Sequence, residues 1–267
     1  KGMGYLRGKL ASKKERCETR YDYYEMKNQM VDISSVIPPE FRWLKECLGW
    51  CSKAVDSIAD RISFVEFSND NFNMQKIYMN NPDVLFDSAI ISSLITSCSF
   101  IYISQKVGEM PRLQVIDGRH ATGIIDPITN MLIEGYAILE EDVLGNPIIE
   151  AYFIQGVTYF YERGEKPYKI KNKAPYPLLV PIINRPDAKR PFGHSVISRA
   201  CISIQQAAMR TLKRSEVSAE FYSFPQKYVL GLEPGVEMDK WKATISSLMQ
   251  ISKDEDGDKP TVGQFAQ

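Results

Sequence analysis

The chain has 267 residues, 44% of them hydrophobic and 25% charged, so it can bury a core and is not of the disordered class. Its 33 basic and 33 acidic residues cancel, which excludes binding to nucleic acid or an anionic membrane through overall charge. The five widely spaced cysteines fit neither a secreted disulfide framework nor a paired CxxC zinc site, so we expect a reducing cytoplasm. No apolar run is long enough to span a membrane, and the basic, polar start lacks the apolar core of a signal peptide.

The N-terminal part is expected to be mainly helical. Residues 9–31 lack Gly and Pro and are rich in Lys, Glu, Arg, Tyr and Met, which predicts a solvated or partner-facing helix. Apolar residues recur at spacings of three and four over 41–62, which predicts a second helix with an apolar stripe. Imperfect alternation over 61–67 predicts a short strand. Residues 83–97 are apolar nearly all round, as in a buried helix, and 100–103 continue as a buried strand.

The middle of the chain, residues 111–183, has a different texture. Short β-rich runs alternate with Gly, Pro, Asn and Asp at fairly even spacing. The segments 142–147 and 163–167 have the composition of hairpin connections. These features predict an antiparallel β meander, and the fold class is therefore α+β, with helices packed on that meander.

A breaker-rich linker over 184–193 leads into the longest clean helical pattern, residues 195–222. Pro225 is expected to end this helix. Beyond it we expect a strand at 228–230, a short helix at 238–249 and an exposed acidic loop at 253–259.

The long helix has two unlike sides when its residues are placed about 100° apart. The apolar side, made largely of small residues, carries Ile197, Cys201, Ile204, Ala208, Leu212, Ser215 and Ala219. The basic side carries Arg199, Gln206, Arg210 and Lys213. Small apolar residues favour close packing against copies of the helix or a thin partner. The basic side is either an ordinary solvated face or a contact with an acidic neighbour or with phosphate.

Enzyme signatures are missing from the sequence. The Walker A, Gly-x-Ser-x-Gly and GxGxxG patterns are absent, which argues against phosphoryl transfer, acyl transfer and dinucleotide binding. His120 and His194 stand in Gly-Arg-His-Ala and Phe-Gly-His-Ser, without the context of a metal site, and are interpreted as loop or capping residues. The acidic loop at 253–259 lacks the terminal glutamate of a calcium-binding loop. No catalytic, cofactor-binding or metal residue is therefore predicted.

Two smaller clusters have alternative interpretations. Cys47 and Cys51 would lie on one face of the second helix, but no second pair completes a zinc site, so we interpret them as small core residues. An aromatic and basic cluster near the N-terminus could stack on nucleic acid or form a protein–protein surface. It consists of Arg16, Arg20, Tyr21, Tyr23, Tyr24 and Lys27.

One long stretch, residues 192–231, reads FGHSVISRACISIQQAAMRTLKRSEVSAEFYSFPQKYVLG. It resembles the portal proteins of tailed phages that infect Gram-positive bacteria. In that family a Gly-x-Ser opening leads into a long helix with Gln-Gln-Ala-Ala, then Glu-x-Tyr-Ser and Pro-Gln-Lys-Tyr-Val-Leu-Gly. Other similar parts follow in order, namely Tyr23-Tyr24, the helix before ISFVEF, the buried helix before SFIYIS, and PLLVPIINRP.

The resemblance implies three parts for the chain. Residues 1–184 would form the outer wing, 185–223 the linker and stem helix, and 224–267 the start of the clip. It also implies that Ile197, Cys201, Ile204, Ala208 and Leu212 pack the stem. Candidate contacts with DNA or with other subunits are Arg199, Gln206, Arg210, Lys213 and Lys227.

The function implied is structural. The protein would be a virion component at the capsid vertex, assembled in the bacterial cytoplasm as a ring of about twelve subunits. Its partners would be its own copies, the terminase large subunit, head-completion or adaptor proteins, and scaffold and capsid proteins. Double-stranded DNA would pass through the channel without sequence preference, and neither a membrane nor a cofactor is implied. A near-neutral chain suits such a channel, since a strongly basic lining would hold the DNA.

The chain differs from the family in one respect. Family members continue into a return stem helix, a tunnel loop and a helical crown, and this sequence stops before them, so we expect a truncated chain. Two alternatives of other classes stay open. One is a phage-encoded α+β enzyme such as a nuclease, and the other is a cytosolic protein-binding module that uses the Tyr-rich N-terminal helix.

Overall fold

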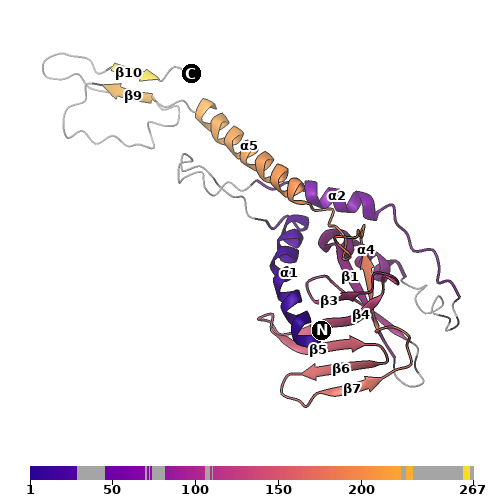
Figure 1. The fold of residues 1–267 in the computed structure, drawn as a ribbon. Helices are drawn as coiled ribbons and strands as arrows, with labels where there is room; N and C mark the ends of the chain where they lie inside the picture. The colour runs from indigo at the N-terminus through magenta and orange to yellow at the C-terminus, as the bar shows by residue number, and fades with distance from the viewer. Residues whose placement is uncertain are drawn as a thin grey trace. The chain divides into compact units, whose positions relative to one another are not determined.

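The structure is a computed structural model that describes residues 1–28, 46–69, 71, 73, 82–105, 109, 111–223, 227–230 and 261–264 (Figure 1). The chain forms two compact units. The first comprises Lys1–Gln29 and Cys47–Gln205, and the second comprises Met30–Glu46 and Gln206–Gln267. The class is mixed α+β with antiparallel sheets, as the sequence predicts.

The helices of the described residues are α1 (Met3–Tyr24), α2 (Trp50–Ala59), α4 (Pro82–Thr96) and α5 (Arg199–Ser223). The position of α4 follows from its ends. Proline at the first position has no N–H to leave unpaired, and Ser97 adopts a left-handed φ of 89° that stops the helix. The long helix α5 is confirmed, although it begins at Arg199 rather than at residue 195.

Three expectations about the N-terminal part need correction. Helix α1 begins at Met3, well before residue 9. Helix α2 is much shorter than 41–62, because Gly49 directly precedes it and glycine disfavours a helix interior. The predicted strand at 61–67 is wrong, since residues 62–67 form no strand. Phe64 instead stacks on Phe86 of α4, with 4.2 Å between ring centroids.

Two antiparallel sheets lie in the first unit. The smaller has the strand order β2-β1-β8 and comprises β1 (Cys98–Ser104), β2 (Arg112–Ile116) and β8 (Leu179–Ile183). The larger is a meander in the order β3-β4-β5-β6-β7. Its strands are β3 (Ala121–Ile125), β4 (Leu132–Glu141), β5 (Pro147–Ile154), β6 (Val157–Glu162) and β7 (Tyr168–Lys171). The predicted meander is therefore confirmed.

The hairpin between β4 and β5 illustrates why the turns fall where they do. The carboxylate of Asp142 accepts backbone N–H bonds from Leu144 at 3.0 Å and from Asn146 at 2.8 Å. Gly145 takes a left-handed φ of 77°, which costs glycine little. Arg163, at the start of the next hairpin connection, binds the same carboxylate at 3.0 Å. The Asp and Gly of this segment thus build the turn that their positions predict.

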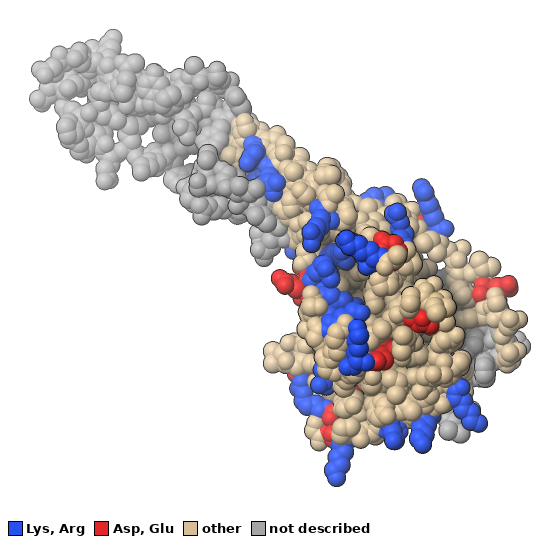
Figure 2. All heavy atoms as spheres, viewed as in Figure 1, with Lys and Arg blue, Asp and Glu red and all other residues tan. Residues whose placement is uncertain are grey.

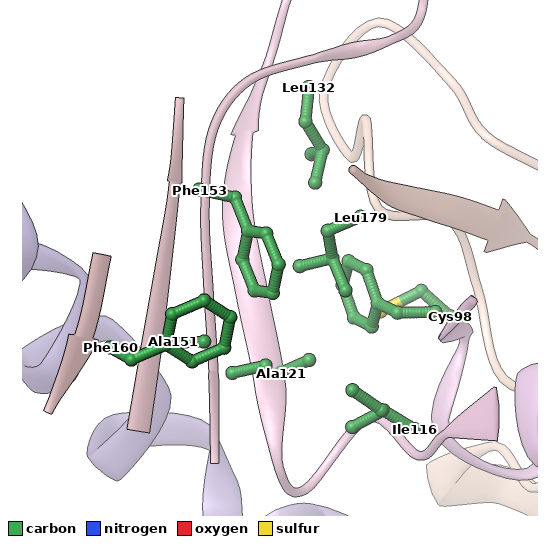
Figure 3. Packing of buried hydrophobic residues seen from close by; sticks show 10 residues of the cluster. Cys98, Ile116, Ala121, Leu132, Ala151, Phe153, Phe160 and Leu179 are labelled. Carbon is green, nitrogen blue, oxygen red and sulfur yellow. The ribbon is translucent and has the colours of Figure 1, made fainter. Parts of the chain in front are cut away.

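The main core lies between the two sheets (Figure 3). Phe153 of the meander points toward Leu179 of β8, and Phe160 and the fully buried Phe100 of β1 belong to the same cluster. Gly135 of β4 allows the two sheets to approach closely, because a Cβ there would lie 2.9 Å from the side chain of Leu179 in β8. The alternating aromatic and small residues of these strands therefore fit one another across the two layers.

The other face of the meander is covered by α1, which lies alongside it in Figure 1. Leu6 and Leu10 are buried against Tyr136 and Ile138 of β4. The expectation of a solvated or partner-facing α1 is therefore wrong for this side of the helix. Its sequence looked solvated because Lys9 and Lys13, which lie three residues after each of these leucines, are directed to the sheet.

A second core joins the helices at the opposite end of α1. Tyr23 of α1, Val55 of α2, Leu94 and Ile95 of α4, and Ile197 just before α5 are all buried together. The short helix α2 is sufficient for this core, because each element contributes only one or two large side chains to it.

In the second unit, α5 continues beyond Gln205, and β9 (Lys227–Leu230) pairs antiparallel with β10 (Thr261–Gln264). The strand predicted at 228–230 is confirmed, whereas the pairing with 261–264 was not foreseen. The end of α5 at Pro225, the helix at 238–249 and the loop at 253–259 lie outside the described residues.

Candidate functional site: the base and sides of the long helix

The segment before α5 is fixed to the end of α4. Val196 donates its N–H to the carbonyl of Leu94 at 2.9 Å, and the hydroxyl of Ser195 donates to the carbonyl of Ile95. Asn184 and His194 close the linker loop, with bonds of 2.8 Å and 2.7 Å between them. The start of α5 is therefore held by the first unit.

Gly193 is the position in this linker loop where no other residue fits. Its φ is 72°, in the left-handed region, and a Cβ would lie 2.1 Å from the carbonyl oxygen of Asn184. The motif Phe-Gly-His-Ser thus has a backbone reason for its glycine. His194 lies in this linker loop, as the sequence predicts. The ring of His194 binds the carboxylate of Asp187.

Gln205 joins α5 to α2, and sequence reasoning missed it. Its side-chain oxygen accepts the N–H of Cys51 at 3.0 Å, which satisfies one of the unpaired donors in the first turn of α2. One turn earlier on α5, the thiol sulfur of Cys201 lies 3.1 Å from that of Cys51. The spacing of four between Cys201 and Gln205 was the available signal, because it places both on one side of the helix.

The two sides of α5 differ from the expectation in part. On the predicted apolar side, Ile204 is 60% exposed and Leu212 is 41% exposed. On the predicted basic side, Gln206 and Lys213 are buried, so the expectation that this side is solvated is wrong for both. They are buried because they share a stripe with Met209, at spacings of three and four.

The remaining site residues are placed as follows. Ile197 is buried and Cys201 half-buried in the helical core, and Ala208 is half-buried. Arg199 is exposed and Arg210 half-buried. Lys227 begins β9. Their packing against other subunits and their contacts with DNA stay predictions.

In the second unit, Lys213 belongs to a charged group. A hydrogen bond to the carboxylate of Glu216, together with burial, raises the pKa of Glu46, while the nearby ammonium of Lys213 acts in the opposite direction. The pair of carboxyl groups therefore holds a proton more readily than two separate glutamates would.

A polar cluster next to His120 is the most chemically distinctive group in the first unit. It lies at a hollow of about 250 Å³ between β2 and β4. The ring nitrogens of His120 each lie 3.1 Å from a carboxylate, Asp117 on one side and Glu141 on the other. Arg119 binds Asp117 at 2.9 Å, and Lys14 of α1 binds Glu141 at 3.2 Å.

The charges in this cluster set the protonation of its members. Hydrogen bonding to Asp117 raises the pKa of His120 against the effect of burial. Burial opposes ionisation of Asp117, yet hydrogen bonds from His120 and Arg119 keep its pKa below the usual range. The cluster is thus a network of paired charges that connects the turn before β3 to β4 and α1. Across the described ranges, no three His, Cys, Asp or Glu side chains converge as they would around a metal ion.

The aromatic cluster at the end of α1 is a packing element. Tyr21 donates its hydroxyl to Ser92 at 2.9 Å, and Tyr24 donates to Asp56 at 3.0 Å. The guanidinium of Arg119 covers the ring of Tyr21, 4.5 Å from its centroid. One face of the Tyr21 ring is therefore covered by Arg119, and stacking of these rings on nucleic acid stays a prediction.

The cysteines are all free thiols. Cys51 is a buried core residue as expected, but Cys47 is exposed, because it precedes α2 instead of lying within it. Among the described residues, no helix combines the length and apolarity needed to cross a membrane.

The chain is similar to the portal protein of Mycobacterium phage L5. The two are 24% identical over 231 residues, which cover 79% of this chain and 47% of the phage protein. The chain therefore spans about half the length of this curated relative. No protein-family profile matches the chain.

Proposed function

We propose that the chain is part of a phage portal subunit, one of about twelve copies in a ring around a channel for double-stranded DNA. The similarity to the portal protein of phage L5 carries this proposal. It covers 79% of the chain, which is too much to come from the motif at 192–231 alone. A structural role at a capsid vertex, without catalysis, follows for the chain if it shares the function of that relative.

Within this proposal, residues 1–184 are the wing, 185–223 the linker and stem, and 224–267 the start of the clip. The fixed base of α5 supports this division, because a stem helix needs a defined direction where it leaves the wing. The terminase, the adaptor and the scaffold and capsid proteins are the proposed partners, as they are for the family.

The exposed apolar side of α5 is the proposed contact between neighbouring stems. Ile204 and Leu212 are large and exposed, which is unfavourable for a helix in water and favourable for one in a ring. A ring forces contacts between unlike surfaces, so the opposite side with Arg199 and Arg210 would meet a neighbour or the DNA. Gln206 and Lys213 are buried, so they would pack inside the subunit and would not form contacts between subunits.

Electron microscopy of the complete gene product tests this function. We expect rings with a central hole, and a product that stays monomeric would refute the portal assignment. Ile204→Asp should greatly reduce the yield of rings, because it places a charge in the stem contact. Ile128→Asp makes the same exchange at an 88% exposed turn outside α5 and should leave the yield unchanged. Equal yields from the two variants would refute the stem contact.

A further inference from the structure

Two of the five cysteines lie in direct contact, although they are far apart in sequence. The sulfur of Cys51, in the first turn of α2, is 3.1 Å from the sulfur of Cys201, in the first turn of α5. Both residues belong to the first unit. The remaining cysteines show no such contact, since Cys47 approaches a carbonyl oxygen and Cys17 and Cys98 are buried elsewhere.

The contact is held by its surroundings. Gln205 fixes the backbone of Cys51 through the bond to its N–H, and both cysteines pack against the buried helical core with Ile197 and Val55. The thiol of Cys51 cannot easily turn away, because it is fully buried among the side chains of this core. The two thiols also differ in access, since Cys51 is completely buried and Cys201 is half-buried.

We propose that Cys51 and Cys201 are a disulfide-forming pair that joins α2 to the base of α5 when the protein meets a peroxide. The half-buried thiol of Cys201 would react first and take one oxygen from hydrogen peroxide, giving a sulfenic acid and one water. The sulfur of Cys51 would then attack the sulfur of that sulfenic acid. The S–S bond forms as the S–O bond breaks, and the thiol proton leaves with the hydroxyl as a second water.

The second step is expected to be the slower one. Burial and the hydrogen bond with Cys201 raise the pKa of the Cys51 thiol to about 12, so little thiolate is present at neutral pH. The rate of cross-linking should therefore increase as the pH rises toward this value. The finished bond would link residues 150 positions apart and limit the unfolded chain accordingly.

Peptide mapping after oxidation of the folded protein tests the pair. The protein is treated with hydrogen peroxide, the free thiols are blocked with N-ethylmaleimide, and the digest is analysed without reduction. We expect the number of free thiols to fall from five to three and one cross-linked peptide to contain Cys51 and Cys201. The melting temperature should rise by about 10 °C and return after reduction with dithiothreitol.

Two substitutions make the test specific. Cys201→Ser should keep all its remaining thiols and show no rise in melting temperature, whereas Cys47→Ser should behave like the unchanged protein. Five free thiols after complete exposure to peroxide would overturn the proposal. So would a cross-link between Cys17 and Cys98, or oxidation of Cys201 to a sulfinic acid without a bond to Cys51. The mapping of the unchanged protein decides the question even if a variant folds poorly.

Discussion

The two edge strands of the five-stranded meander differ in how they are covered. At the β3 edge, Lys9 and Lys13 of α1 donate to the carbonyls of Gly123 and Ala121, at 2.7 Å and 2.8 Å. At the other edge, all four residues of β7 (Tyr168–Lys171) are exposed. One edge is therefore closed by side chains of a helix, and the other is open.

The difference shows how a single helix can close a strand. Residues four apart on a helix are separated by about 6 Å, and carbonyls two apart on a strand by about 6.8 Å, so two lysines match two outward carbonyls. The ammonium groups also lie over aromatic rings, Lys9 above Phe192 at 4.4 Å and Lys13 above Phe100 at 5.6 Å. Figure 2, in the same view as Figure 1, shows basic side chains gathered on the surface at α1.

Removing the packing under α1 should break the closed edge most severely. Leu6 is fully buried, so Leu6→Ala should lower the free energy of unfolding by about 2–5 kcal/mol through lost burial and a cavity. Urea unfolding measures the loss. Tyr5→Ala, at the neighbouring 48% exposed position, should cost far less. Similar losses for both variants would mean that α1 is not fixed by its buried side.

The lysine bond itself should have a smaller effect. Lys13→Met keeps the aliphatic stem and removes the donor to the carbonyl of Ala121, which should cost about 1–2 kcal/mol. Hydrogen exchange should also become faster in β3. The control is Arg16→Met, which removes an exposed charge from the same helix and should change stability by less than about 0.5 kcal/mol. If Arg16→Met lowers the free energy of unfolding as much as Lys13→Met does, the loss reflects the removed charge and not the hydrogen bond to the edge of β3.

The meander and its turns could be predicted from the sequence because their rules are local. Alternating β-rich runs and the Asp-Val-Leu-Gly-Asn turn need only their neighbours. The closed edge could not be predicted in this way. Nothing in residues 9–31 distinguishes a lysine that binds a carbonyl 114 positions away from one that faces water.

The long helix teaches the same lesson about the candidate site. Its existence and approximate limits followed from a 3.6-residue pattern, and the glycine and serine before it marked its base. The buried side did not follow, because the stripe through Gln206, Met209 and Lys213 mixes polar and apolar residues. Gln205 was missed for a similar reason, since its role depends on the N-terminus of α2. Hydrophobicity alone cannot identify a polar side chain that is buried with its partner.

The stability of the fold should depend on pH through His120, at the start of the β3 edge. His120 directly precedes β3 and lies between Asp117 and Glu141, with Arg119 and Lys14 behind those carboxylates. Because the pKa of His120 is raised in the folded protein, its contribution is complete below the ordinary value of 6.5. That contribution is lost as the pH rises through the higher folded value.

Urea unfolding from pH 5.5 to pH 8.5 measures this loss, with His120→Gln as the reference. The free energy of unfolding of the unchanged protein should fall relative to that of the variant across this range. The fall should be smaller than the loss expected for Lys13→Met, because the imidazole is 23% exposed and solvent screens its charge. His194→Gln serves as a control, because its ring and its partner Asp187 are more exposed. An unchanged difference between the protein and His120→Gln at all pH values would contradict the raised pKa.

The open edge should respond with the smallest change in stability and a change in association instead. Unpaired strand edges can pair with other chains, and lysines such as Lys169 and Lys171 weaken that tendency. Ile170 is 51% exposed, so Ile170→Lys should alter the free energy of unfolding by less than about 0.5 kcal/mol. Light scattering at increasing protein concentration should nevertheless show less association, since a third lysine is added to the edge. Ile133→Lys is the matched control, because Ile133 is also 51% exposed but lies on β4, which is paired on both sides. A decrease in Ile170→Lys alone assigns the association to the open edge of β7, whereas equal decreases would assign it to exposed apolar surface of any kind.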